Sequence, residues 1–258
     1  MTQPQNRGVW RSARTDPADC VGMCLVLPHA GGGPFAAMSL ARHCDQHQVL
    51  VADYPWRTVG APSTDGVFDE FVAAAVREAP VDGGSPVVLY GHSMGAIAAF
   101  RIAVGLKQER GVTPAVLVLS GSGPEPAARR VSFSDWSDEE LRTHLAVLDP
   151  QVSLSGGELL LDDSVLPVVR SDYDAYARVS NEGLVLSGTR TLVLGGDDDA
   201  LVPVDELLAW SAHVPAGRLT VRVVSGGHFA VRDHIEAVAA ELMAGSSMPE
   251  GNFSEIRP

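Results

Sequence analysis

One stretch indicates the fold of this chain: Pro86-Val-Val-Leu-Tyr-Gly-His-Ser-Met-Gly95, followed by Ala96-Ile-Ala-Ala-Phe-Arg-Ile102. Its first residues predict a short buried strand, and its alanine-rich end predicts a helix. Between them lies a Gly-x-Ser-x-Gly sequence, whose glycines let strand and helix approach closely while Ser93 projects from the sharp turn. This context favours a nucleophilic serine over an ordinary glycine-rich turn.

Apolar, strand-like runs alternate with helix-like runs on both sides of this stretch. We predict strands at Met23–Leu27, Val49–Asp53, Pro86–Tyr90, Ala115–Leu119, Thr191–Leu194 and Leu219–Val224. We predict helices at Pro34–Cys44, Phe68–Ala79, Met94–Leu106, Val204–His213 and Val231–Ala244. Nearly continuous apolar strands that alternate with helices are typical of a parallel sheet covered on both faces. The expected fold class is therefore α/β, with a mostly parallel sheet flanked by helices.

Residues 121–188 depart from this alternation. They contain no strand of comparable quality, but Ser137-Asp-Glu-Glu140 is a capping box ahead of a helical pattern, and Leu166–Val179 is a second amphipathic stretch. We predict a helical lid, inserted after the fourth strand and outside the sheet. The 258 residues then form a single domain. Its ends, 1–7 and 245–258, are rich in small and polar residues and are expected to be flexible.

Composition argues against several classes of partner. The net charge of −13 and the pI near 4.9 disfavour nucleic acid and anionic membranes, because both require a basic surface. The first residues lack the apolar segment of a signal peptide, and no run of about 18 apolar residues is present. The cysteines Cys20, Cys24 and Cys44 lack metal-ligand spacing and suggest free thiols. We expect a cytoplasmic protein that binds no metal, membrane or nucleic acid.

A serine nucleophile needs a base, and His228 stands where an α/β sheet can supply one. It follows the last predicted strand through the loop Ser225-Gly-Gly227, so its ring can reach across the carboxyl edge of the sheet. A carboxylate must fix the tautomer of that ring. Three aspartates follow the preceding strand, and the bend after the glycines favours Asp199, with Asp197 second and Asp198 third.

The oxyanion that forms when serine attacks an acyl carbon needs two backbone N–H donors. One is predicted at Met94, the residue after the serine. The other is predicted at Ala30, in the glycine-rich loop Pro28-His-Ala-Gly-Gly-Gly33 after an early strand. This loop does not match a phosphate loop, because no Lys-Ser/Thr follows its glycines.

Six motifs occur in the order and spacing of one known family. They are Pro28-His-Ala-Gly-Gly32, Asp53-Tyr-Pro-Trp-Arg57, Gly91-His-Ser-Met-Gly-Ala96, Leu166-Pro-Val-Val-Arg-Ser-Asp172, Gly196-Asp-Asp-Asp199 with Trp210 eleven residues later, and Gly226-Gly-His-Phe229. Over about Trp10 to Ala244, the chain resembles the type II thioesterases, the stand-alone editing enzymes of polyketide and nonribosomal peptide synthases. The resemblance implies an α/β-hydrolase fold. It also implies a triad of Ser93, Asp199 and His228, with oxyanion donors at Ala30 and Met94.

The activity that the resemblance implies is hydrolysis of acyl or aminoacyl thioesters on the phosphopantetheine arm of acyl or peptidyl carrier proteins. This reaction clears stalled or misprimed units and requires no cofactor beyond the arm itself. We predict substrate contacts from His29, His92 and Phe229, which lie in the site loops. The family usually has proline at Ala200 and glycine at Trp56, so Trp56 is predicted to reach the acyl pocket and alter substrate preference.

Two alternatives share parts of this pattern. A small-molecule carboxylesterase or lipase-like α/β-hydrolase would have the same elbow, triad and fold, because fold does not determine substrate. A non-catalytic α/β-hydrolase scaffold would be expected to lack a triad residue, and candidates for all three are present in the sequence.

Overall fold

The computed structural model describes residues 8–13, 20–33, 38–57, 66–81, 84–129, 133–149, 164–244 and 254–256. Within these residues the centre is an eight-stranded sheet in the order β1-β3-β2-β4-β5-β6-β7-β8. Its strands are β1 (Trp10–Ser12), β2 (Gly22–Leu27), β3 (His47–Ala52), β4 (Val87–His92), β5 (Val116–Ser120), β6 (Arg190–Gly196), β7 (Leu219–Val224) and β8 (Ser254–Ile256). The six central strands, β2 to β7, pair in parallel, and β1 and β8 pair antiparallel at the two edges.

The six predicted strands are confirmed as β2 to β7, with small shifts in their bounds. β2 and β5 are buried along their whole length, which explains their continuous apolar sequence. The two edge strands were not predicted, because three residues with polar members carry no clear periodicity. β8 corrects the expectation that all of 245–258 is flexible, since residues 254–256 pair with β7. Residues 1–7, 245–253 and 257–258 lie outside the described residues.

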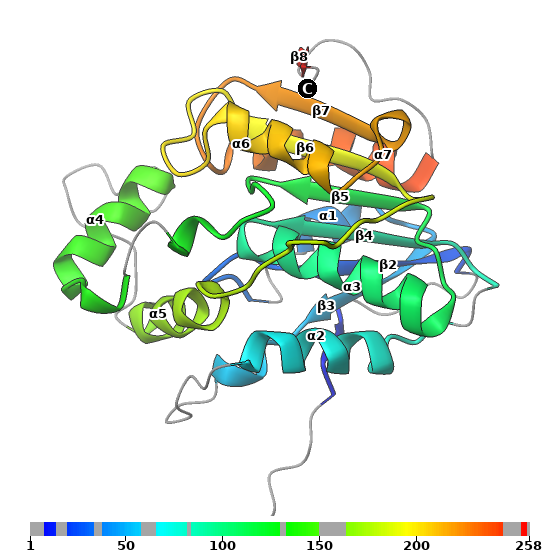
Figure 1. The fold of residues 1–258 in the computed structure, drawn as a ribbon, viewed down its shortest axis with the longest axis horizontal. Coiled ribbons are helices and arrows are strands. Elements are labelled where there is room, and N and C mark those ends of the chain that lie inside the picture. Colours follow the sequence, from blue (N-terminus) through cyan, green and yellow to red (C-terminus); the bar gives the residue numbers. More distant parts are fainter. Residues whose placement is uncertain are drawn as a thin grey trace, which may run out of the picture.

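Helices cover both faces of the sheet (Figure 1). α2 (Val67–Glu78), α3 (Met94–Arg110) and α6 (Val204–Leu208) contribute to the apolar core on one face, and α1 (Met38–Arg42) and α7 (Ile235–Ala244) to the core on the other. Short 3₁₀ segments lie at η2 (Pro55–Arg57), η6 (Ala209–Ala212), η7 (Ala216–Arg218) and η8 (Ala230–His234). α1 covers only part of the helix predicted at 34–44, and residues 34–37 are outside the described part.

The segment between β5 and β6 contains helices that lie beside the sheet, at the left of Figure 1. Its described elements are η3 (Ala127–Arg129), η4 (Phe133–Asp135), α4 (Asp138–Leu148) and α5 (Val165–Tyr176). The predicted capping box is confirmed at the start of α4. Ser137 Oγ accepts a hydrogen bond from Glu140 N, and the Glu140 carboxylate accepts one from Ser137 N. The helical insertion is therefore present outside the sheet.

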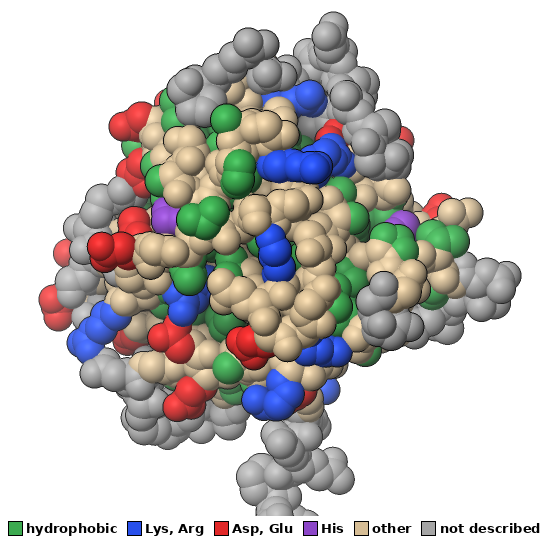
Figure 2. Space-filling view, turned by 45° about the vertical axis from the view of Figure 1, so that its right-hand side comes forward, with side chains coloured by type: hydrophobic (Ala, Val, Ile, Leu, Met, Phe, Trp, Pro, Cys, Tyr) green, Lys and Arg blue, Asp and Glu red, His purple; other side chains and the backbone are tan. Residues whose placement is uncertain are grey.

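The face in Figure 2 carries acidic and basic side chains interspersed, with hydrophobic side chains in small groups among polar ones. The large hydrophobic side chains that are exposed in the described part of the chain lie on four different segments: Val21, Met38, Val147 and Val185. Most of the large hydrophobic side chains are thus buried in the two cores. Parallel α/β sheets bind ligands at the carboxyl ends of their strands, so we expect the site at that edge.

Candidate active site

Ser93 occupies a strained turn between β4 and α3. In the described part of the chain it is the one residue other than glycine with a positive φ, at 55°. A side chain at Gly95 would overlap the carbonyl group of Leu27, and one at Gly91 would overlap the backbone of Gly95. The Gly-x-Ser-x-Gly sequence is therefore required by the close approach of β4, α3 and the loop after β2, and it fixes Ser93 at the strand's carboxyl end.

His228 and Asp199 form a buried pair beyond the carboxyl ends of β7 and β6. His228 Nδ1 lies 2.8 Å from Asp199 Oδ2, and the two residues are only 2% and 7% exposed. The other carboxylate oxygen of Asp199 accepts hydrogen bonds from the backbone N–H groups of Leu201 and Val202, at 2.8 and 3.1 Å. Because an ionised carboxylate only accepts hydrogen bonds, Nδ1 carries the proton and Nε2 is the acceptor nitrogen of His228.

The sequence left three aspartates open, and the structure brings Asp199 to His228. Asp197 is exposed, and its Oδ1 accepts a hydrogen bond of 2.8 Å from Gly226 N. Asp197 thus supports the glycine loop that precedes His228 without contacting the imidazole. Asp198 is exposed as well. Asp199, the first choice from the sequence, is thus the aspartate that contacts His228.

Ser93 and His228 line one cavity of about 140 Å³. Ala30 lines it too, and so do His29 and Phe229, which were predicted to contact substrate. The remaining wall is mostly apolar and comes from α4 and α5: Leu145, Leu148, Val165, Val169 and Tyr173. The structure therefore brings the sheet edge and the inserted helices together around the serine.

Met94, the other predicted oxyanion donor, is the first residue of α3. The first N–H groups of a helix have no partner within the helix, so the Met94 amide is available to an oxyanion next to Ser93. In the glycine-rich loop, Gly31 N donates to Asp172 Oδ2 at 2.7 Å and Gly32 N donates to His29 O at 2.9 Å. Ala30 lines the cavity together with His29 and Gly31, and the amides of the two residues that follow it already have partners.

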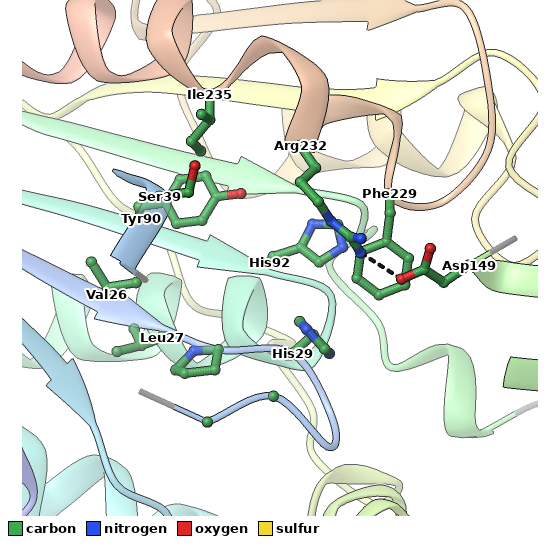
Figure 3. Close-up of a pocket in the computed structure, with 13 residues that line it drawn as sticks. Val26, Leu27, His29, Ser39, Tyr90, His92, Asp149, Phe229, Arg232 and Ile235 are labelled. Atoms are coloured by element: carbon green, nitrogen blue, oxygen red, sulfur yellow. Dashed lines mark hydrogen bonds and ion pairs between the residues drawn. The ribbon is translucent and has the colours of Figure 1, made fainter. Parts of the chain in front are cut away.

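A second cavity, of about 450 Å³, adjoins the first (Figure 3). His29, Asp149 and Phe229 line both cavities, and His92 lines only the second. Figure 3 shows Arg232 reaching over the Phe229 ring toward Asp149, with Arg232 Nη2 2.7 Å from Asp149 Oδ2. His92, one of the predicted substrate contacts, therefore lines the cavity next to the one that contains Ser93.

The imidazoles of His29 and His92 are neutral at pH 7. Burial lowers the pKa of His29 to about 4, although the hydrogen bond to the Ala30 carbonyl opposes the shift. Burial, followed by the nearby His228, lowers the pKa of His92 well below its usual range. His92 Nδ1 lies 2.9 Å from Ser120 Oγ. Neither ring therefore adds a positive charge beside His228.

The prediction that Trp56 reaches the acyl pocket is not supported by its position. Its side chain is 3% exposed, stacks on Tyr54 and Phe68, and lines neither of the two cavities. The indole packs on Phe68 and Phe71 of α2, so Trp56 lies in the core and outside both of these cavities. Its Nε1 donates to Asp172 Oδ1 at 2.7 Å.

Asp172 is the residue that sequence reasoning missed. Asp172 ends the motif Leu166–Asp172, but it was assigned no role from the sequence. An acidic side chain on the apolar side of an amphipathic helix is a signal that could have marked it as a buried, hydrogen-bonded residue. In the structure it is fully buried on α5 and faces the glycine-rich loop.

Comparisons with known proteins agree with this geometry. The family model described as a thioesterase domain matches residues 24–244. The chain belongs to the thioesterase family. Among solved structures, this family member resembles the type II thioesterase BorB from the borrelidin biosynthetic cluster. The TM-score is 0.72 at 27% identity, over 92% of this chain and 97% of BorB. The resemblance to type II thioesterases and the α/β-hydrolase fold are thereby confirmed.

Two curated relatives are similar at the sequence level. Thioesterase PikA5 of Streptomyces venezuelae is 31% identical over 246 residues, which cover 91% of this chain and 84% of PikA5. Phenyloxazoline synthase MbtB of Mycobacterium tuberculosis is 32% identical over 240 residues, which cover 88% of this chain and 16% of MbtB. This member of the thioesterase family therefore corresponds to only a small part of MbtB.

None of the described helices combines the length and the apolar character needed to cross a membrane. Among the described residues, no three His, Cys, Asp or Glu side chains gather in a set that could ligate a metal ion.

Proposed function

We propose that this chain hydrolyses acyl or aminoacyl thioesters on the phosphopantetheine arm of acyl or peptidyl carrier proteins, and so edits stalled or misprimed synthases. The observation that carries the proposal is the buried His228–Asp199 pair, whose histidine lines the same cavity as the strained Ser93. Membership in the thioesterase family and the similarity to BorB support the choice of a thioester as substrate.

In the proposed reaction, Ser93 Oγ attacks the thioester carbonyl while His228 Nε2 takes the hydroxyl proton. Asp199 holds the imidazole in the required tautomer and stabilises its positive charge. The negative oxygen of the tetrahedral intermediate accepts hydrogen bonds from Ala30 N and Met94 N. The carbon–sulfur bond then breaks, and the carrier thiol leaves with the proton from His228.

Deacylation repeats these steps with water. His228 Nε2 accepts a proton from a water molecule that attacks the acyl-Ser93 ester, a second oxyanion forms in the same site, and the carboxylic acid leaves while Ser93 regains its proton. Thiolates are good leaving groups, so the acid step is undemanding and the oxyanion donors supply much of the rate enhancement. We propose that no metal or resident cofactor takes part.

The proposed partner is a carrier protein in the cytoplasm, with no role for nucleic acid or membrane. Such carriers are typically acidic, and this chain has a net charge of −13. Long-range attraction therefore does not favour the encounter, and docking depends on local contacts. The interspersed charges on the face in Figure 2 are compatible with such local pairing.

Mass spectrometry of a panel of acyl-loaded carriers, before and after incubation with the protein, tests the proposal. We expect free carrier thiol with the wild type and intact acyl carriers with Ser93→Ala. Rapid hydrolysis of p-nitrophenyl esters with untouched carriers would favour the small-molecule esterase. Failure of the wild type to hydrolyse either substrate or to react with a fluorophosphonate would favour the non-catalytic scaffold.

A further inference from the structure

The buried carboxylate of Asp172 joins three segments that are distant in the sequence. It accepts hydrogen bonds from Gly31 N at 2.7 Å and from Trp56 Nε1 at 2.7 Å. Arg57 Nε lies 2.9 Å from Oδ1, and Arg57 Nη2 lies 2.5 Å from Oδ2. Asp172 is 0% exposed, so its carboxylate has no contact with water, and these hydrogen bonds replace those that water would make.

Arg57 uses its remaining N–H groups on the same glycine-rich loop. Its Nη1 donates to Gly32 O at 2.5 Å, and its Nη2 donates to His29 O at 3.3 Å. The loop is therefore held on both sides of Ala30. Asp172 accepts a hydrogen bond from the Gly31 amide, and Arg57 donates to the carbonyl groups of His29 and Gly32.

Helix α5 also contacts this loop by packing. Gly31 has a φ of 77°, and a Cβ at this position would lie 2.7 Å from Val169 Cγ2. Val165, Val169 and Tyr173 of the same helix line the cavity with Ser93. One helix thus forms the apolar wall of the cavity and, through Asp172, fixes the loop that carries Ala30.

We propose that Asp172 and Arg57 are positioning residues that aim the Ala30 N–H at the oxyanion, so that transition-state stabilisation depends on α5 being seated against the loop. Neither side chain lines the serine cavity, so both act through the backbone of His29–Gly32. Trp56 belongs to the same arrangement, because its indole N–H is a donor that glycine at this position would lack. The inference rests on the proposed acyl-transfer chemistry at Ser93.

The test compares Asp172→Asn with Glu241→Gln. An asparagine NH₂ group facing these N–H donors cannot replace a carboxylate oxygen. Glu241 is a matched control, because it is a buried carboxylate paired with Arg190 away from the cavity. Completed fluorophosphonate labelling counts the folded sites in each preparation. We expect the kcat of Asp172→Asn per labelled site to fall roughly 10²- to 10³-fold with KM changed less than about threefold, as for loss of an oxyanion donor.

Two pantetheine-linked inhibitors separate positioning from general damage. An acyl trifluoromethyl ketone forms a hemiketal oxyanion with the serine, whereas an alkyl thioether has no carbonyl group to attack. We expect Asp172→Asn to weaken the ketone by the same factor as kcat and to leave the thioether almost unchanged. Unchanged kcat and ketone affinity, or equal weakening of both inhibitors, would overturn the proposal.

Trp56→Phe keeps the inference testable if Asp172→Asn does not fold. The phenyl ring can still stack on Tyr54 and Phe68 but donates no hydrogen bond to Asp172. We expect a roughly three- to tenfold loss of kcat and of ketone affinity at constant KM. A wild type that hydrolyses no carrier thioester would instead refute the proposed substrate. The ketone comparison between wild type and variant would still decide the positioning role.

Discussion

Helices α4 and α5 line the same cavity but are attached to the molecule in different ways (Figure 1). α5 has a continuous buried side, with Tyr173 and Tyr176 packed in the main core and Asp172 bound to the glycine-rich loop. α4 buries only Leu141 and Leu148. The inserted segment is therefore not one uniform lid. We infer that α5 is a fixed wall of the site and that α4 is the part that can move.

One ion pair on each helix shows the same contrast. The side chains of Asp172 and Arg57 are 0% and 14% exposed, whereas those of Asp149, at the end of α4, and Arg232, in η8, are 14% and 37% exposed. Losing one partner of a buried pair strands the other charge, which costs several kcal/mol, whereas a surface pair contributes at most about 1 kcal/mol.

The largest effect is expected at the sheet edge, where the groups are held most rigidly. Asp199→Asn should lower kcat by roughly 10³- to 10⁴-fold, because the imidazole then adopts the wrong tautomer. Asp197→Asn is the matched control and should lose less than about tenfold, since Asp197 only supports the Gly226 amide. Steady-state kinetics on an acyl carrier checks both. A larger loss with Asp197→Asn would reverse the assignment.

Trp56→Gly probes the core beneath α5. Removing the stacked indole should lower the free energy of unfolding by about 3–5 kcal/mol, the range for large aromatic truncations in cores. Because Trp56 lines neither cavity, the ratio of kcat/KM for acetyl- and hexanoyl-loaded carriers should stay within about twofold. Urea denaturation and the two kinetic assays measure these quantities. A changed ratio would return Trp56 to the acyl pocket.

Acidification should loosen α4 before α5. Burial lowers the pKa of His144 to about 4, and its ring packs on Phe133 and Trp136. Since the pKa in the undocked state is near 6.5, α4 docking is fully stable above pH 6.5 and weakens as the pH falls toward 4. Hydrogen exchange at pH 7.5 and 5.5, corrected for intrinsic rates, should show lost protection in 138–148 but not in 165–176.

His144→Phe is the control for this acid response. The variant keeps an aromatic ring beside Phe133 but cannot take up a proton, so the exchange of α4 should no longer depend on pH. Equal acid sensitivity of α4 in the variant would assign the effect to other groups.

The smallest effect is expected at the carboxyl end of α4. Asp149→Asn removes the ion pair with Arg232 and should accelerate exchange in α4 by roughly two- to fivefold, since a partly exposed pair contributes at most about 1 kcal/mol. The melting temperature should change little. Exchange in 165–176 is the internal control. A loss of protection in both helices would contradict the difference in attachment between α4 and α5.

Much of the architecture could be predicted because it depends on local sequence. Burial on both faces requires the continuous apolar runs of β2 to β6, and the close approach at the elbow requires Gly91 and Gly95. The capping box at Ser137 satisfies backbone donors only three residues away. Motif order then indicated Ser93, His228 and the glycine-rich loop.

The sequence by itself determined the six central strands, the serine turn and the helical character of the insertion, because each depends on residues close by in the chain. Only the tertiary structure decided that Asp199 meets His228, that Trp56 turns inward, and that Asp172 holds a loop 141 residues away. The reason is physical. A buried carboxylate is stable only where distant donors converge on it, and no local pattern records which donors those are.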